Sequence, residues 1–212
     1  FTVTNPQYAI LKHCGIIIRL ASFDYIGKKL ISAVLHKEKE SVQENINGEI
    51  LETITHFTYG NSSHTQVTKQ NIVFPDLTTQ ETKYQYSHEK GNTFLTGKNM
   101  IGIPLETEVK KNGLVISKTE TKYPVSQAEA DLKTSGLPLP VSVSSLDLQS
   151  NAMNMGVLYK KYDSRGNLLQ YNLKPDVNGN SGNPVTIIWD YNQTQPIAKI
   201  EGAKLSDIPQ GL

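Results

Sequence analysis

Short runs of residues that alternate in character, each closed by turn-forming residues, most strongly limit how this chain can fold. In each run every second residue is hydroxyl-bearing, aromatic or aliphatic, and Gly, Asn or Pro follows. A period of two predicts β-strands, and the closing residues predict hairpin turns. We therefore expect an all-β fold of antiparallel hairpins in one continuous twisted sheet. The five clearest sets sharing a strand face are Thr53, Thr55, Phe57 and Tyr59; Thr82, Tyr84 and Tyr86; Ser117, Thr119, Thr121 and Tyr123; Leu169, Tyr171 and Leu173; and Val185, Ile187, Trp189 and Tyr191.

The pair Asn112 and Gly113 predicts a tight hairpin. It separates two alternating runs, residues 105–110 and 114–123. The favoured two-residue hairpin turn needs positive φ at both central positions, and Asn followed by Gly supplies it at low cost. We therefore expect two antiparallel strands joined directly at this pair, which is the strongest local signal in the chain.

Residues 124–140 interrupt the strand pattern. The stretch 126–132 is compatible with a short surface helix or with a loop, and prolines keep residues 136–140 extended, as in a linker. A chain of 212 residues is long enough to bury a core without cross-links. We expect a single β domain over residues 1–212, with a loop or linker at 124–140.

Composition and charge exclude several classes of partner. The chain carries 21 basic and 20 acidic residues, a formal charge of +1, so nucleic acid is not expected to bind. No apolar run reaches transmembrane length, so direct membrane insertion is not expected either. Cys14 is the only cysteine, which excludes an intrachain disulfide, and the three isoleucines after Gly15 predict that its thiol is buried.

Four acidic residues could serve a hydrolase, but each has a simpler role. A glycoside hydrolase needs two facing carboxylates, and Asp163, Asp190, Glu106 and Glu108 are the available candidates. Turn capping accounts for the two aspartates, and exposure on strands accounts for the two glutamates. The chain also lacks the Gly-x-Ser-x-Gly elbow of a nucleophilic serine. We therefore expect no catalytic residue and no cofactor.

The five histidines do not show the spacing of a metal site. His56 and His64 flank a turn and could meet across it as metal ligands. Scattered surface histidines explain the pattern more simply, so we expect no metal.

Aromatic residues offer a binding surface for sugars. The chain has ten tyrosines, five phenylalanines and one tryptophan, and sugars stack on exposed rings. Trp189, Tyr191, Tyr171 and Tyr162 could form such a platform. However, Trp189 lies in the most apolar run of the chain, which predicts burial of its ring. A glycan therefore stays an alternative partner.

Residues 162–168 read Tyr-Asp-Ser-Arg-Gly-Asn-Leu and are similar to the core of the YD repeat, a Tyr-Asp pair followed by two residues, a glycine and a polar residue. In such a turn we expect Asp163 to cap the backbone and Gly166 to take positive φ, with Asn167 as the polar residue. We expect Tyr162 to pack on the neighbouring hairpin. Three other stretches resemble divergent copies: 23–27, 57–61 and 189–192.

The wider sequence, notably residues 81–86 and 192–200, is similar to Rhs-like proteins of gliding bacteria that use type 9 secretion. This resemblance spans about residues 15–205. It implies a long β-sheet ribbon that winds into a shell or solenoid outside the cell, with this chain as a C-terminal piece. Shell-forming members often carry an Asp-Pro-x-Gly self-cleavage motif. Here Ile208 separates Asp from Pro, so autoproteolysis is not expected.

These features favour a non-catalytic structural and protein-interaction module. The edge strands of an open sheet present backbone groups that a partner strand can satisfy. On the resemblance, the partner is a surface protein such as an adhesin, or a secretion-system component, and the module is extracellular or on the cell surface. The alternatives are a carbohydrate-binding module, which needs two aromatic rings on one solvated face, and an all-β hydrolase, which needs two carboxylates in a concave pocket.

Overall fold

The computed structural model describes residues 9–13, 16–20, 36–176, 179, 181–190 and 192–209. The chain divides into two compact units, residues 1–35 and 36–212. In the first unit, β1 (Ala9–His13) pairs antiparallel with β2 (Ile16–Leu20). The expectation of a single domain over residues 1–212 stays a prediction, because the two units are described separately. Cys14 and the predicted motif copy at 23–27 lie outside the described residues.

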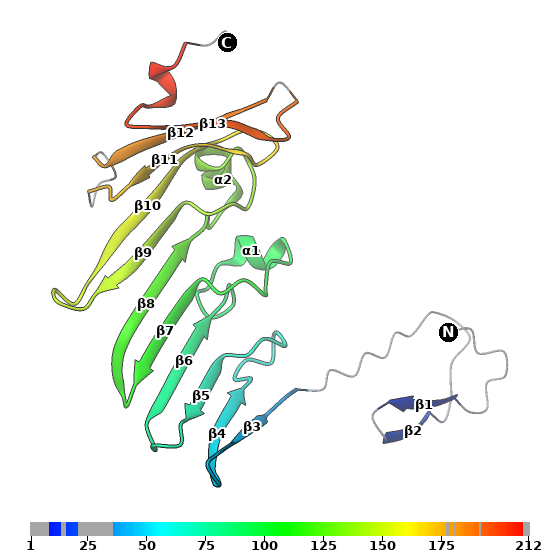
Figure 1. Ribbon diagram of the computed structural model, residues 1–212. Coiled ribbons are helices and arrows are strands. Elements are labelled where there is room, and N and C mark those ends of the chain that lie inside the picture. The colour runs from blue at the N-terminus through cyan, green and yellow to red at the C-terminus, as the bar shows by residue number, and fades with distance from the viewer. Residues whose placement is uncertain are drawn as a thin grey trace. The chain divides into compact units, whose positions relative to one another are not determined.

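The second unit is one open sheet of eleven strands, each paired antiparallel with its neighbours in sequence (Figure 1). This arrangement confirms the prediction of an all-β fold built from hairpins in a continuous sheet. The two edges are formed by β3 and β13. The strands are β3 (Lys39–Ile46), β4 (Glu49–Thr58), β5 (Lys69–Val73), β6 (Thr79–Gln85), β7 (Glu106–Lys111), β8 (Leu114–Lys122), β9 (Ser142–Asp147), β10 (Ala152–Tyr162), β11 (Leu168–Leu173), β12 (Asn183–Trp189) and β13 (Pro196–Glu201).

The connections differ between the two ends of the strands. Short turns follow most odd-numbered strands, and two of them are Asn-Gly pairs with positive φ: Asn47 with Gly48, and Asn112 with Gly113. The second pair joins Lys111 directly to its cross-strand partner in β8, which is the two-residue hairpin that the sequence predicts. The connections after the even-numbered strands, which include the three longest (after β4, β6 and β8), lie at the opposite end, here called the loop end (Figure 1).

Two short helices interrupt the strands at the loop end. α1 (Thr93–Gly97) connects β6 to β7, and α2 (Gln127–Lys133) connects β8 to β9. The region predicted as a loop or linker, 124–140, contains α2 and joins two strands that pair with each other, so it is a connection within one sheet. A 3-10 turn, η1 (Leu205–Asp207), follows β13. Among the described residues, no helix is long and apolar enough to cross a bilayer.

The register of the strands gives the sheet two distinct faces. The strand residues of all five sets predicted from the sequence fall on one face, here called the tyrosine face. The opposite face is charged in the N-terminal half of the sheet, where it carries Lys83, Glu106, Glu108, Lys118 and Glu120. Both faces follow from the period-two alternation of a strand.

Among the described residues of the second unit, few side chains are fully buried. Five of the six buried hydrophobic residues lie in or next to the connections of the loop end, and the sixth lies in β12. Elsewhere cross-strand pairs stabilise a sheet whose faces are partly solvated. The buried hydrophobic residues are Tyr86, Leu95, Leu105, Ala130, Tyr162 and Val185.

Candidate interaction site

The loop end is held by a repeated tyrosine hydrogen bond. Three even-numbered strands end in or just before a tyrosine whose hydroxyl donates to a backbone carbonyl beside the preceding odd-numbered strand. In each case the acceptor lies two residues before that odd-numbered strand begins. The three bonds are Tyr59 Oη to Lys37 O at 3.1 Å, Tyr86 Oη to Val67 O at 2.7 Å, and Tyr162 Oη to Pro140 O at 2.8 Å.

The backbone repeats around these tyrosines. Phe57 N donates to Glu38 O and Tyr84 N to Thr68 O, so in these two repeats the residue two before the tyrosine bonds the residue just before the odd-numbered strand. Thr121 N donates to Leu105 O in the same way, which puts Tyr123 in the equivalent place. Before Tyr162 the donor is Tyr159, three residues earlier, and its N–H bonds Val141 O. Four hairpins, β3–β4, β5–β6, β7–β8 and β9–β10, therefore end in a tyrosine at the loop end, whereas β11–β12 ends in Trp189.

Burial favours the neutral phenol at the loop end. Burial, reinforced by the neighbouring Tyr84 and Glu89, raises the pKa of Tyr86 to about 12. Burial also raises the pKa of Tyr162 and of Tyr123. These tyrosines keep their protons at physiological pH and stay hydrogen-bond donors.

The turn after Tyr162 is organised by Asp163. Its Oδ1 accepts N–H bonds from Arg165 at 2.9 Å and Asn167 at 2.8 Å, and its Oδ2 accepts from the Asn167 side chain at 2.9 Å. Gly166 takes φ +91°, in the region that favours glycine. Burial raises the pKa of Asp163, but these hydrogen bonds outweigh it and the pKa is lowered. The carboxylate is committed to the turn.

The turn after β12 has the same plan. Asp190 Oδ1 accepts from Thr194 N at 2.9 Å, four residues on, as Asp163 does from its own turn. The two turns touch, because the Asn167 side chain donates to Gln193 O at 2.9 Å. The Arg165 guanidinium also donates to the Asn192 carbonyl. Adjacent repeats are thus joined at the loop end.

The predicted sugar platform is not assembled as an exposed surface. Tyr162 is 6% exposed and its hydroxyl is bonded, so its ring cannot be stacked upon. Trp189, whose ring the sequence predicts to be buried, is half-buried, and its indole N–H donates to Leu168 O at 3.0 Å. Tyr171 is half-buried on β11, and Tyr191 lies outside the described residues.

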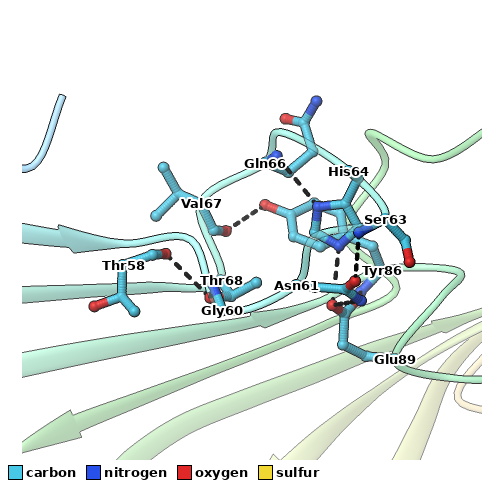
Figure 2. A network of polar contacts seen from close by, with 10 residues as sticks. All are labelled: Thr58, Gly60, Asn61, Ser63, His64, Gln66, Val67, Thr68, Tyr86 and Glu89. Atoms are coloured by element: carbon cyan, nitrogen blue, oxygen red, sulfur yellow. Dashed lines mark hydrogen bonds and ion pairs between the residues drawn. The ribbon is translucent and has the colours of Figure 1, made fainter. Parts of the chain in front are cut away.

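A polar network near the first tyrosines ties the β4–β5 connection to the end of β6 (Figure 2). His64 is buried, and its Nε2 lies 2.9 Å from Glu89 Oε1. The same oxygen accepts from the Asn61 amide at 2.6 Å, and Glu89 Oε2 accepts from Tyr86 N at 3.0 Å. The His64 ring also meets the Tyr86 ring edge-on, with centroids 5.0 Å apart.

The hydrogen bonds define the charge state of this network. Gln66 N donates to His64 Nδ1 at 3.2 Å, so the ring proton sits on Nε2 and points at Glu89. Burial raises the pKa of Glu89, but the bonds from Asn61, Tyr86 and His64 outweigh it and lower the pKa to about 2. The network thus consists of a neutral His64 held by the Glu89 carboxylate, and these bonds hold the β4–β5 connection in place.

The histidines predicted as potential metal ligands have other roles. His56 is exposed on β4 opposite Asn71, whereas His64 is committed to Glu89 and Gln66. Within the described ranges, no group of three or more His, Cys, Asp or Glu side chains could hold a metal ion.

The two glutamates considered for hydrolysis lie in an ion-pair ladder on the charged face. Glu106 bonds Lys90 and Lys118, each at 2.8 Å. Glu108 contacts Lys118 at 3.6 Å and Lys110 at 3.2 Å. Burial raises the pKa of Glu106, but the lysines outweigh it and the pKa is lowered. Both carboxylates pair with lysines on the sheet surface.

The β3 edge is the most accessible part of the sheet. All eight of its residues are exposed. Val42 and Ile46 are each 50% exposed although both are apolar. The alternation at Thr53, Thr55 and Phe57 predicts β4, but no sequence pattern described above predicts that β3 pairs with it. The Asn47–Gly48 pair between two alternating stretches is the signal that identifies this hairpin.

No protein-family model matches the chain, and no curated protein matches it significantly.

Proposed function

We propose that this chain is a non-catalytic structural and protein-interaction module of an Rhs-like bacterial surface protein. In this role it docks on another surface protein, such as an adhesin, or on a secretion-system component. The observation that carries the proposal is the single open sheet of hairpins, most of them ending in a tyrosine, with a fully exposed edge strand. Such a sheet is an extended scaffold that offers strand edges and broad faces to partners.

The local geometry around Tyr162 supports the YD-repeat part of the proposal. A Tyr-Asp pair at the end of a strand places the tyrosine against the preceding hairpin and the aspartate in the turn. Trp189 and Asp190 repeat this arrangement one hairpin later. A repeat whose aromatic residue and turn acid have fixed roles explains why these residue types recur at irregular intervals along the chain.

The commitments of the polar residues support a non-catalytic role. Asp163 and Asp190 cap turns, Glu106 and Glu108 pair with lysines, and Glu89 holds His64. A general acid or base must exchange a proton with a substrate, and each of these groups is already bonded to partners within the fold. Location at the cell surface and a type 9 secretion route rest on the sequence resemblance.

Co-purification followed by native mass spectrometry tests the proposal. The protein is isolated under non-denaturing conditions from the cells that make it, and the mass of the intact complex is measured. A complex of fixed stoichiometry with one surface or secretion protein is the expected result. A monomer that instead retains a glycan in a binding screen would favour the carbohydrate-binding alternative.

A further inference from the structure

The two edges of the sheet differ in how well they could accept another strand. β3 pairs with β4 in unbroken register over all eight residues. β13 has six residues, begins at Pro196, and follows a register shift between Ile188 and Trp189. Proline, short length and irregularity are features that protect an edge from pairing. β3 lacks all three, so it is the edge suited to strand addition.

The hydrogen-bonding pattern between β3 and β4 determines which backbone N–H and C=O groups of β3 point away from the sheet. Phe57 N donates to Glu38 O, so Glu38 and every second residue after it face β4. Antiparallel pairs alternate between bonded and non-bonded positions. The peptide groups of the intervening residues therefore point away from the sheet, and no described backbone group pairs with them. These residues are Lys39, Ser41, Gln43 and Asn45.

The side chains of β3 on the tyrosine face present an acid between two apolar residues. Val42 and Ile46 flank Glu44 on this face. Glu40, at the start of the strand, is already paired with Lys37 at 2.8 Å. Glu44, in contrast, makes no ion pair or hydrogen bond with any described residue. The edge thus presents the Glu44 carboxylate, which has no described basic partner, between two half-exposed apolar side chains.

We propose that the β3 edge binds an extended segment of the partner protein that places a basic side chain opposite Glu44 and apolar side chains opposite Val42 and Ile46. This inference rests on the docking function proposed above. The added strand runs antiparallel, because the three residues then occupy non-hydrogen-bonded pairs, where opposing side chains come closest. Opposite charges at such a pair stabilise a sheet, and like charges destabilise it.

Edge protection is the competing role for Glu44, since charged side chains also discourage strand pairing. The two roles differ in their response to charge. A protective carboxylate opposes every added strand, and its neutralisation increases binding. A recognising carboxylate favours a basic strand, and its reversal inverts that preference.

A peptide titration separates these roles. The probe is a synthetic peptide with the order Thr-Val-Thr-Lys-Thr-Val-Thr, and its control carries Glu in place of Lys. Binding to the full chain is followed by NMR titration. The lysine peptide should bind at least five-fold more tightly than its control. In the Glu44→Lys variant, the preference should reverse.

A backbone variant shows whether the peptide pairs as a strand. Gln43→Pro removes an outward N–H without removing a bond to β4, and proline is tolerated at such edge positions. Gln43→Ala is the matched control, because both variants lose the side-chain bond to Glu52. Gln43→Pro should lose binding at least ten-fold while circular dichroism stays unchanged, and Gln43→Ala should bind like the native chain. Equal binding of both peptides, or binding that survives Gln43→Pro, would overturn the proposal.

Co-purification with the same variants separates this inference from the docking function. Loss of the natural partner in Gln43→Pro but not in Gln43→Ala supports docking at β3. Retention of the partner by Gln43→Pro overturns the β3 assignment and leaves the docking function in place. Absence of any partner from the native chain contradicts the docking function itself, and the peptide titration then decides the β3 edge alone.

Discussion

Tyrosine hydroxyls at the loop end bind carbonyls that lie just before the odd-numbered strands. A phenylalanine would fill the same volume but could not donate this bond. The excess of tyrosine over phenylalanine, ten to five, is therefore explained in part by the repeat itself. Three such bonds join connections that are far apart in sequence, by 19 residues for Tyr86 and 22 for Tyr59 and Tyr162.

Replacement of Tyr162 by phenylalanine tests one of these bonds. The variant loses the 2.8 Å bond to Pro140 O in a buried setting, so its free energy of unfolding should fall by about 1 kcal/mol in urea. Tyr84→Phe is the control, because its hydroxyl lies 3.4 Å from Gln70 Oε1 and should contribute little. Equal effects of the two changes would show that the hydroxyl of Tyr162 does not stabilise the repeat.

Acid should weaken the network of Figure 2. Glu89 has its folded-state pKa lowered from 4.5 to about 2, so its stabilisation is present above pH 4.5 and is lost as the pH falls to about 2. At pH 7 the free energy of unfolding of Glu89→Gln should be about 1 kcal/mol lower than that of the native chain. This value is smaller than the full pKa shift implies, because solvent partly screens the carboxylate. The variant's free energy of unfolding should vary less with pH over that window. Parallel pH profiles for the two proteins would contradict the role of Glu89.

At this scale, the sequence predicts contacts that are close in the chain and misses those that are distant. The roles of Asp163 and Gly166 follow from residues within the same turn. The bond between His64 and Glu89 joins positions 25 residues apart, and it depends on how two connections meet. A single sequence carries no signal for that meeting.

At the scale of elements, the period-two pattern predicts β4, β6, β7, β8, β11 and β12, where residues of like character recur on one face of the strand. It also predicts the turn at Asn112 and Gly113, where both residues have positive φ. α1 was not predicted. Its five residues are too few for a helical period, and Asn92 starts the helix by accepting a bond from Leu95 N. The pairing of β3 with β4 was not predicted, because the charged residues of β3 resemble those of a loop.

Glycine substitutions test the turn assignment. Gly113→Ala should destabilise the sheet by about 1 kcal/mol, because φ +81° strains any residue with a Cβ even though no atom lies near. Gly97→Ala is the matched control, since it also meets no atom but has no positive φ. It should leave stability unchanged or raise it slightly. Thermal unfolding of both variants measures the difference. An unchanged stability of Gly113→Ala would exclude a turn with positive φ at both central residues.

At the scale of the whole molecule, the open sheet explains how a chain with few buried residues can be ordered. Each hairpin repeat contacts only its neighbours, so stability accumulates along the sheet rather than around one central core. The cost of this architecture is two strand edges. β13 is blunted by its proline and its register shift, and β3 is left regular and exposed. The proposed docking function makes use of that edge.

Residue-resolved hydrogen–deuterium exchange by NMR, with and without the co-purified partner, tests this account most directly. In the free protein, the outward amides of Ser41, Gln43 and Asn45 should exchange rapidly, and the inward amides of Val42 and Glu44 should exchange more slowly. Addition of the partner should slow the three outward amides. Outward amides that are already protected in the free protein, or that the partner leaves unchanged, would contradict docking at the exposed edge.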